Sequence, residues 1–350
     1  MTTTITFEEA VGRIFAAHDF QDLAGGAAGG PAYRKWAKAV HPDAVSAARR
    51  ATATDAFAKL SALYKARSEA GTAATGEAAG GARGEARAEP VVQGRRRAYR
   101  MGRVFAKGDL AELFADGSAL IKVPRQPADN DLMEAEAKAL RRLWLDGDPR
   151  FRPYAPRLIE TFVHEDDRRR RRRVNVLERQ HGMISLAEID RDLDPRDVAW
   201  MWRRLLTALG WAHRAGVVHG AVLPEHVLIH PQEHGLVLVD WCYAGLGRQQ
   251  PDGSYAGHRP AAIVKARRDF YPPEVLHDRS AGPATDIYMA TRLMTRLIGP
   301  RIPASLRRFA AGCTYDAPRM RPQDAWALLG EFDDLIHQLY GPRKFRPFVP

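Results

Sequence analysis

One stretch of the chain, residues 71–98, divides it into two segments with different sequence patterns. It is rich in glycine, alanine and arginine, and it has no aromatic residue and no apolar periodicity. Such a stretch cannot bury enough apolar surface to offset the entropy lost on folding, so we expect a flexible linker. The 350-residue chain is therefore expected to form one domain over residues 1–70 and a larger one over residues 99–350.

The overall composition favours a globular, cytoplasmic protein. With 45% hydrophobic residues the chain can bury a substantial core, and its two cysteines, Cys242 and Cys313, lie far apart, which suits a reducing compartment. The N-terminus has no basic start followed by an apolar stretch, and no run approaches the roughly 18 apolar residues that a membrane helix needs. We therefore expect no signal peptide and no membrane partner.

The formal net charge of +11 raises the question of an anionic partner. The largest single contribution is the run Arg168–Arg173, which has no interleaved aromatic residues of the kind that stack on single-stranded nucleic acid. The run lies between two strand-like stretches, residues 156–163 and 174–179, so we expect a solvated hairpin loop. A nucleic-acid partner that binds these arginines is the weaker alternative.

Three helices are expected in the N-terminal segment. The first begins with Thr6, followed three residues later by Glu9, which is the pattern of a capping box. A Gly/Ala stretch over residues 24–30 precedes the second helix, "PAYRKWAKAV", and the third lies in residues 54–66. The apolar residues at helical spacing in the first and third helices are Phe7, Val11, Ile14, Phe15, Phe57, Leu60, Leu63 and Tyr64.

A tripeptide of His41, Pro42 and Asp43 directly follows the second helix. Pro42 ends that helix because it lacks the backbone N–H that the next hydrogen bond needs. With "YRKWAKAV" before it and "AFAKLSALY" after it, the tripeptide resembles the J domain of DnaJ-type co-chaperones. A Gly/Ala loop stands where that family has a Leu-Gly-Val turn. A proline-terminated helix without a partner is the alternative interpretation.

The resemblance implies a partner. In the J-domain family, the tripeptide loop and the basic helix dock on a DnaK-type chaperone ATPase and stimulate its ATP hydrolysis. Attraction between the basic helix and an acidic partner surface would mainly speed association, and it would weaken in salt. The docking residues that the resemblance implies are Tyr33, Arg34, Lys35, Lys38, His41, Pro42 and Asp43.

The C-terminal segment changes from short strands to long helices, which is an α+β order. In "GDLAELFADGSALIKV", Asp116-Gly117 is a two-residue hairpin signal between alternating apolar residues. Lys122 then lies inside an apolar strand, where an ammonium is costly unless an anion meets it. Helices are expected at residues 133–145 and 200–216, followed by the paired strands "HVLIH" and "GLVLVDW".

This order of elements resembles the protein kinase fold, and the resemblance implies two lobes, over about residues 99–178 and 179–340. It further implies that Lys122 holds nucleotide phosphates and pairs with Glu136, with Glu134 as the alternative partner. The implied nucleotide-binding residues are Gly108, Lys122, Glu136, Leu177, Glu178 and Asp240.

Other roles are implied by the same resemblance. Asp240 would be a magnesium ligand, and Asp286 would brace the catalytic loop. Glu274 would form a structural ion pair with Arg321.

The loop in which the kinase family carries its catalytic aspartate is altered. The family's His-Arg-Asp is here His219, Gly220 and Ala221, and an alanine side chain cannot accept a proton. Leu223 and His226 replace the lysine and the metal-binding asparagine of that loop. Because losing a general base alone costs about two to four decades in rate, we predict a pseudokinase without a catalytic residue.

Two glycine positions of the family also differ. Trp241 and Cys242 replace the Phe-Gly that would follow Asp240. The glycine-rich loop keeps only Gly108, because alanines stand at the positions of its other glycines, Ala106 and Ala111.

The leading hypothesis is a cytoplasmic co-chaperone or adaptor. Its J-like domain would recruit a DnaK-type ATPase, and its pseudokinase domain would bind a client protein or sense ATP with magnesium. An internal ion-pair network of Lys122, Glu136 and Asp240 is the alternative use of the retained residues. The alternative function is an atypical kinase or phosphotransferase that uses His226 or Glu225 as its base.

Two further groups of residues are only weak candidates for a functional site. His226, His230 and His234 recur every four residues, but strand-like residues and a proline between them disfavour a shared helix face, so no metal site is expected at these histidines. A nucleophilic Cys242 beside His219 would lack an orienting partner.

Overall fold

The computed structural model describes residues 5–24, 29–40, 45, 49, 52, 53, 55–57, 59–61, 63, 64, 90–247 and 258–350. The side chains of residues 29–31 and 34 are outside this description. The chain divides into two compact units. The first holds Met1–Arg87 and Pro342–Pro347, and the second holds Ala88–Gly341 and Phe348–Pro350.

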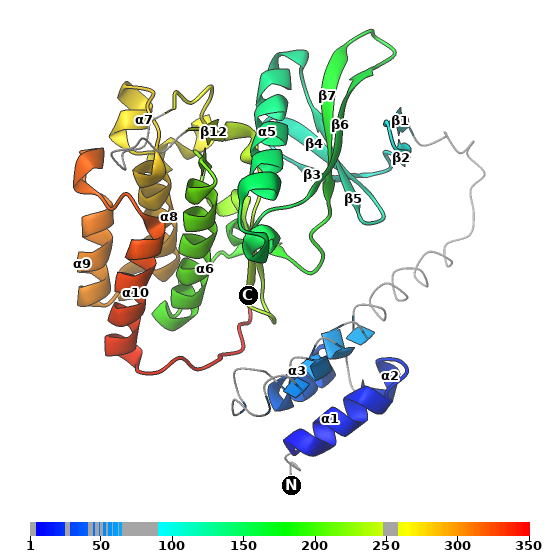
Figure 1. The fold of residues 1–350 in the computed structure, drawn as a ribbon, viewed down its shortest axis with the longest axis vertical. Coiled ribbons are helices and arrows are strands. Elements are labelled where there is room, and N and C mark those ends of the chain that lie inside the picture. The colour runs from blue at the N-terminus through cyan, green and yellow to red at the C-terminus, as the bar shows by residue number, and fades with distance from the viewer. Residues whose placement is uncertain are drawn as a thin grey trace. The chain divides into compact units, whose positions relative to one another are not determined.

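The first unit is helical in its described part (Figure 1). α1 spans Phe7–Ala16, α2 spans Gln21–Ala24 and α3 spans Gly29–Ala39. Between residues 52 and 64, all the described residues are helical. α1, α3 and the helical residues from 52 to 64 lie close to the three predicted helices, whereas the short α2 was not predicted.

α1 forms largely as its sequence predicts. Glu9 N donates to the Thr6 hydroxyl at 3.3 Å, so the expected cap at the start of this helix is present. Ala10 and Ile14, one turn apart, are fully buried, whereas Phe15 is 45% exposed. The buried stripe does not include Phe15, because one residue is a rotation of about 100° around a helix.

Aromatic side chains dominate the core of the first unit. The rings of Phe20, Tyr33 and Tyr64 pack with centroids 4.6 to 6.5 Å apart. The indole Nε1 of Trp36 donates to the Leu23 carbonyl at 2.8 Å. These contacts bind α3 to α2 and to the helical residues near position 64.

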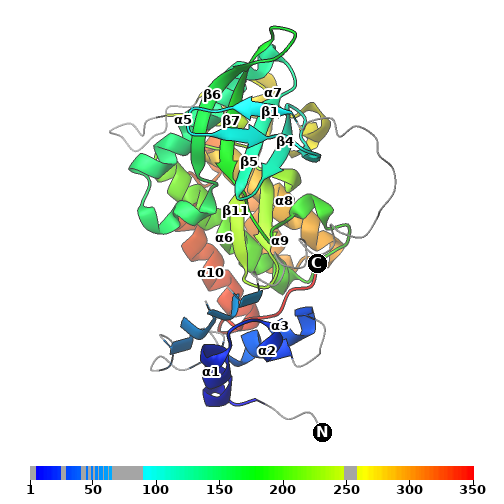
Figure 2. The same ribbon diagram turned by 90° about the vertical axis from the view of Figure 1, so that its right-hand side faces the viewer.

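The second unit begins with strands. Five of them form an antiparallel sheet in the order β3-β4-β5-β7-β6, and α5 packs against β6 and β7 (Figures 1 and 2). A separate hairpin of β1 and β2 precedes this sheet. The bounds are β1 Val91–Gln93, β2 Ala98–Arg100, β3 Val104–Lys107, β4 Ala111–Asp116, β5 Ala119–Pro124, α5 Asn130–Asp146, β6 Leu158–Glu165 and β7 Arg171–Glu178.

The first hairpin corrects the expected linker boundary. β1 and β2 lie partly or wholly inside residues 71–98, so the stretch from Val91 onward is structured. Val92 and Tyr99 are buried there, in one cluster with side chains of the main sheet. Three-residue strands among arginines show no clear apolar period, which is why the sequence did not reveal them. Residues 71–89 of the expected linker lie outside the described residues.

The hairpin between β4 and β5 is present, shifted by one residue from the expected turn. Asp116 pairs with Ala119 in the ladder, so Gly117 and Ser118 form the loop. Gly117 has a φ of +61°, a conformation that favours a residue without Cβ.

The arginine run spans the hairpin between β6 and β7. Arg171–Arg173 belong to β7, so only Arg168–Arg170 lie in the turn, where a loop over the whole run was expected. Asp166 pairs with Arg170 and Arg172 at 2.8 and 3.2 Å. Part of the positive charge is therefore neutralised within the hairpin.

The rest of the second unit is mainly helical. α6, α8, α9 and α10 pack together (Figure 1), and β8, β10 and β11 form a small antiparallel sheet beside α6 (Figure 2). β9 pairs with β12. The bounds are β8 Ile184–Ser185, α6 Pro195–Arg214, β9 Val217–Val218, β10 Val227–His230, β11 Gly235–Leu238, β12 Gly245–Leu246, α7 Pro273–His277, α8 Pro283–Ile298, α9 Ala304–Cys313 and α10 Ala325–Tyr340.

The long helix α6 has clear sequence causes. Arg196 N donates to the Asp194 carboxylate at 2.8 Å, and Pro195 occupies the first helical position, whose N–H has no partner inside a helix. Trp202 and Leu205 of its apolar face are fully buried in the main core, which also includes residues of α5. α6 therefore helps to join the sheet part to the helical part.

Helices and antiparallel sheets together confirm the expected α+β class. Among the described residues, no helix combines the length and the apolar character that a membrane span requires.

Candidate functional site

A buried lysine lies at the centre of the candidate site. Lys122 is on β5, opposite Leu113 of β4 and Asn175 of β7, and only 4% of it is exposed. Its Nζ lies 2.9 Å from Glu136 Oε1 and 2.8 Å from Asp240 Oδ1. Two carboxylates thus offset the cost of burying the ammonium, as its place in an apolar strand requires.

Three segments bring these groups together. α5 carries Glu136, and Asn175 of β7 holds it in place by donating from Nδ2 to Glu136 Oε2 at 2.9 Å. Asp240 follows β11 and has a φ of +61°. Cys242, two residues later, accepts a hydrogen bond from Lys122 Nζ at 3.2 Å. Lys122, Glu136, Asp240 and Cys242 are called the lysine cluster below.

The charges in the lysine cluster stabilise one another. Burial disfavours the charged lysine, but Asp240 and Glu136 outweigh it and raise the pKa of Lys122 well above its ordinary value. Burial likewise opposes the charge of Asp240, yet Lys122 and His226 lower its pKa below the ordinary range.

Cys242 behaves differently from its charged neighbours. Burial, assisted by the charge of Glu136, raises the pKa of the Cys242 thiol well above its ordinary value. The thiol therefore stays protonated, which makes it a poor nucleophile.

The lysine cluster has the spacing of a cation site. Glu136, Asp240 and Cys242 form a group, within the described part of the chain, whose ligand atoms lie within 4.8 Å of one another. Lys122 Nζ lies 2.8 to 3.2 Å from an atom of each, so the ammonium takes the position of a cation. Because magnesium prefers oxygen ligands and a thiol does not suit it, these residues fit magnesium poorly.

The loop at residues 219–226 is held by a buried aspartate. Asp286 of α8 accepts hydrogen bonds from the backbone N–H groups of His219 and Gly220, both at 2.8 Å, as expected of a brace. Gly220 has a φ of +73°, and a Cβ there would lie 2.6 Å from the Tyr243 carbonyl oxygen. The loop therefore follows a path that only glycine allows at this position.

The side chains inside this loop belong to the apolar core. Ala221 and Leu223 are fully buried. His219 is buried as well, and burial lowers its pKa to about 4. Its Nε2 donates to the Val239 carbonyl at 3.0 Å, and its Nδ1 accepts from the Ala221 N–H at 3.2 Å. Both nitrogens of a neutral imidazole are thus occupied.

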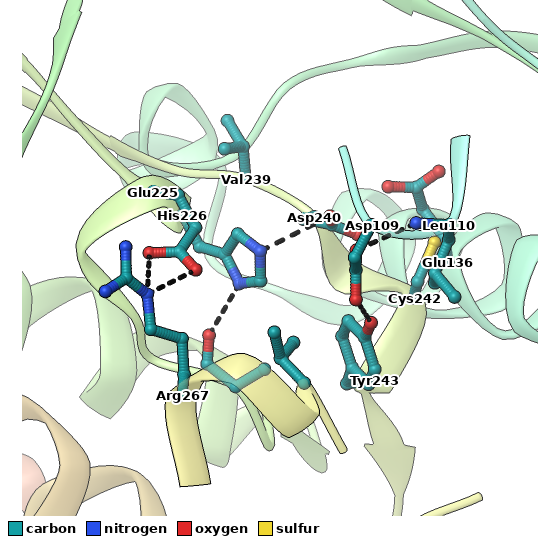
Figure 3. Close-up of polar contacts among 12 residues, drawn as sticks. Asp109, Leu110, Glu136, Glu225, His226, Val239, Asp240, Cys242, Tyr243 and Arg267 are labelled. Carbon is teal, nitrogen blue, oxygen red and sulfur yellow. Dashed lines mark hydrogen bonds and ion pairs between the residues drawn. The ribbon is translucent and has the colours of Figure 1, made fainter. Parts of the chain in front are cut away.

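His226 connects the loop to the lysine cluster (Figure 3). Its Nδ1 donates to the Ala221 carbonyl at 2.8 Å, and its Nε2 lies 3.4 Å from Asp240 Oδ2. Both ring nitrogens face protein groups. The imidazole therefore has no free nitrogen with which to take a proton from a substrate.

Two glutamates considered from the sequence are engaged elsewhere. Arg267 Nε donates to both carboxylate oxygens of Glu225, at 3.0 and 3.1 Å (Figure 3). Glu134 pairs with Lys138 at 2.9 Å on the outside of α5. Glu136, and not Glu134, is therefore the partner of the buried lysine.

One contact of the site was not expected from the sequence. The Tyr243 hydroxyl donates to Asp109 Oδ2 (Figure 3), and Asp109 follows Gly108 in the loop between β3 and β4. Burial and the charge of Asp109 raise the pKa of Tyr243, so its hydroxyl stays a donor. The Tyr243 ring also stacks beside His226, with centroids 6.1 Å apart. The contact joins the sheet loop to the segment after Asp240.

The other residues expected to bind nucleotide lie on the same sheet. Gly108 N donates to the Ala111 carbonyl at 2.9 Å across the turn between β3 and β4. Leu177 is buried near the end of β7, and Glu178 ends that strand. The Glu178 carbonyl accepts a hydrogen bond from Gln180 Nε2 at 3.0 Å.

The expected structural ion pair is present. Arg321 Nη1 and Nη2 donate to the two carboxylate oxygens of Glu274 at 2.7 and 2.9 Å. Thr285 Oγ1 donates to Glu274 Oε1 at 3.0 Å. The pair is buried and bidentate, a geometry that compensates both charges.

The three regularly spaced histidines belong to different elements. His226 lies in the turn before β10, His230 ends β10, and His234 stacks on Trp200 with ring centroids 4.1 Å apart.

The expected chaperone-docking residues are only partly described. His41, Pro42, Asp43 and the side chain of Arg34 lie outside the described residues. Lys35 and Lys38 are exposed on α3. Tyr33 is only 3% exposed and its hydroxyl bonds to Ser61 Oγ at 3.0 Å, so its side chain supports α3 from inside the unit.

A comparison with models of known protein families found no match, and a search of curated proteins found none either. The functional assignment therefore depends on the geometry of the site.

Proposed function

We propose that the second unit is a bilobal, protein-kinase-like domain that binds a partner without transferring phosphate. The whole chain would act as an adaptor: its N-terminal unit recruits a DnaK-type chaperone ATPase, and its kinase-like domain holds a client protein. One observation carries the proposal. Lys122, Glu136 and Asp240 are in contact, while the fully buried Ala221 stands where a kinase has its catalytic carboxylate.

The arrangement of the elements supports a kinase-like fold. An antiparallel five-stranded sheet with one packed helix precedes a part dominated by helices. The lysine on β5 pairs with Glu136 of α5, Asp286 bonds to the backbone of the altered loop, and Glu274 pairs with Arg321. These are the pairings that the sequence resemblance implies.

Phosphoryl transfer is disfavoured by the groups around Ala221. A protein kinase needs a carboxylate that accepts the hydroxyl proton and metal ions that neutralise the phosphates. Ala221 offers no side-chain acceptor, Glu225 is paired with Arg267, and His226 is engaged at both ring nitrogens. The loss of a base alone lowers a rate by about two to four decades. An atypical kinase would therefore lack a free base here.

A nucleotide would have to compete with the protein's own contacts. Phosphates would reach Lys122 only by displacing Asp240 or Cys242, which already bond to its Nζ at 2.8 and 3.2 Å. Exchanging one anion for another around the same ammonium gives little net free energy. We therefore propose that the lysine cluster mainly holds the sheet to the helical part, and that ATP binding is weak and independent of magnesium.

The first unit supplies the recruiting function in this proposal. Lys35 and Lys38 are exposed on α3, while Tyr33 and Trp36 of the same helix are buried. The helix is thus anchored by one face and presents lysines on the other. Such a face favours association with an acidic partner surface, and the association should weaken with salt.

A chaperone ATPase assay tests the recruitment. The full-length protein should stimulate ATP hydrolysis by a DnaK-type chaperone, and the His41→Gln protein should not. His18→Gln, the same change at an exposed position of the first unit, is the matched control and should stimulate normally. Stimulation by His41→Gln equal to that of the unmodified protein would exclude the co-chaperone function.

Labelled ATP tests the absence of catalysis. Incubation with radiolabelled ATP, magnesium and a mixture of acceptor proteins should give no label transfer above background. Transfer that disappears in the Asp240→Ala variant would overturn the proposal, because it would show that the site performs phosphoryl transfer.

A further inference from the structure

A groove of about 250 Å³ lies on the second unit, and it shares no residue with the lysine cluster. Three segments form it: the C-terminal half of α5, the start of β6, and the turn between β1 and β2. The sequence patterns predicted no functional role for these segments.

The floor and one rim of the groove are apolar. Leu140 is buried at its base, and Leu158 and Ile159 are half-buried. Trp144 and Leu145 on the rim are 41% and 76% exposed. Residues four apart share a helix face, so Leu140 and Trp144 of α5 line the groove together. Large exposed apolar side chains beside a groove are typical of an interaction surface.

Three exposed arginines surround this apolar floor. Arg157 has a loose contact with Glu178, at 3.8 Å between Nε and Oε2. Arg96 and Arg141 have no ion-pair partner within the part of the chain that the structure describes. The Glu160 carboxylate, under the β1–β2 turn, accepts hydrogen bonds from the backbone N–H of Arg96 and from the Tyr99 hydroxyl. The groove therefore carries unbalanced positive charge around an apolar base.

We propose that this groove docks an acidic peptide segment of another protein. Leucine or phenylalanine side chains of the segment lie on the apolar floor, and its carboxylates face the three arginines. A nucleic acid fits less well, because its bases stack on free aromatic faces, and the Arg152 guanidinium already occupies one face of the Trp144 ring, 4.3 Å from its centroid. The docking depends on neither the chaperone nor the kinase-like assignment.

Fluorescence anisotropy with the full-length protein tests the docking. The probe is a labelled peptide in which glutamates alternate with leucine and phenylalanine. We expect the Arg141→Glu, Arg157→Glu double variant to bind it about tenfold more weakly or worse, and Leu145→Ser about threefold more weakly. Arg168→Glu reverses one charge on the β6–β7 hairpin and is the matched control. It should stay within about twofold of the unmodified protein.

Several results would overturn the proposal. Equal binding of a peptide whose leucines and phenylalanines are replaced by serine would indicate attraction to any polyanion. Weakening by Arg168→Glu as strong as that of the groove variants would indicate the same unspecific attraction. Sedimentation that reveals self-association, lost in Leu145→Ser, would assign the groove to a second copy of the chain. The substituted side chains are exposed, and thermal melting of each variant verifies that it folds.

Discussion

The lysine cluster and the loop at residues 219–226 adjoin each other through His226, yet their chemistry differs. In the cluster, a buried ammonium has two carboxylates and a thiol within 3.2 Å, so its charge is fully compensated. In the loop, Ala221 and Leu223 are part of the apolar core, and His219 is held neutral. In these two regions, the protein buries a charge only together with groups that neutralise it. The loop keeps its backbone path although most of its buried side chains are apolar.

Removing the charge of Lys122 should change the stability of the protein more than any other substitution in these two regions. Lys122→Met keeps the length of the side chain but removes the ammonium that pairs with both Glu136 and Asp240. We expect a loss of about 3–5 kcal/mol in the free energy of unfolding, because an uncompensated charge stays buried. Urea unfolding followed by circular dichroism measures it.

An exposed lysine on the same helix provides the control. Lys138 has 58% of its side chain exposed and, among the described residues, forms an ion pair only with Glu134, so Lys138→Met should cost no more than about 0.5 kcal/mol. If Lys122→Met costs as little as this control, the cluster does not hold the unit together.

Acidification should protonate His219 in the loop before it protonates Asp240. Burial lowers the pKa of His219 from 6.5 to about 4, so between these values the unfolded state binds a proton that the folded state does not. Stability should therefore be complete above pH 6.5 and fall towards pH 4, by on the order of 3 kcal/mol. Urea unfolding at a series of pH values measures this slope.

Lys122 and Asp240 should not titrate in that window. The raised pKa of Lys122 means that its contribution is lost only at alkaline pH, above its ordinary value of 10.5. The lowered pKa of Asp240 means that its contribution is lost only in acid, below its ordinary value of 3.8. In His219→Gln the slope between pH 6.5 and 4 should flatten, and an unchanged slope would assign the effect to other groups.

Introducing a carboxylate into the loop should destabilise the protein without giving it kinase activity. Ala221→Asp places a polar group in a fully buried position among apolar side chains, at a cost of about 2 kcal/mol. Ala187→Asp, at an exposed position, should cost less than about 0.5 kcal/mol. Thermal melting gives the stabilities. Transfer of labelled phosphate by Ala221→Asp would mean that the missing carboxylate alone prevents catalysis.

Addition of ATP should change the stability of the protein least. At about 1 mM it should add no more than about 0.4 kcal/mol to the stability, the value expected when the concentration equals the dissociation constant. Magnesium should not increase the thermal shift. Tyr243→Phe keeps the ring but removes the hydroxyl that joins the β3–β4 loop to the segment after Asp240. The protein loses one contact with which ATP would compete, so the thermal shift that ATP causes should be larger in this variant. A shift of several degrees that needs magnesium in the unmodified protein would contradict the weak binding proposed.

Local patterns predicted many of the elements but few of their contacts. Lys122 is a charged residue inside an apolar run. This pattern predicted both the strand and the need for an anion beside the lysine. The choice between Glu134 and Glu136 rested on a resemblance, and the structure decided it, because these two residues point about 160° apart around α5. The first hairpin was missed because its strands have only three residues each and flank a turn rich in arginine.

The most distant contacts were beyond any local pattern. Tyr243 and Asp109 are 134 residues apart in the chain, and Asn175 reaches Glu136 across 39 residues. Neither pair follows from residue spacing, because each depends on how the sheet, α5 and the segment after β11 pack against one another. The groove beside Trp144 depends on the same packing.

The sequence by itself determined the α+β class, the positions of the main helices and strands, and the absence of a side-chain acceptor at Ala221. Those properties depend on residue identity and on patterns within one element. Only the tertiary structure decided that three groups share the Lys122 ammonium and that Glu225 and His226 are already bonded to other residues. The reason is physical: hydrogen bonds and ion pairs act over about 3 Å, and only folding brings distant segments that close.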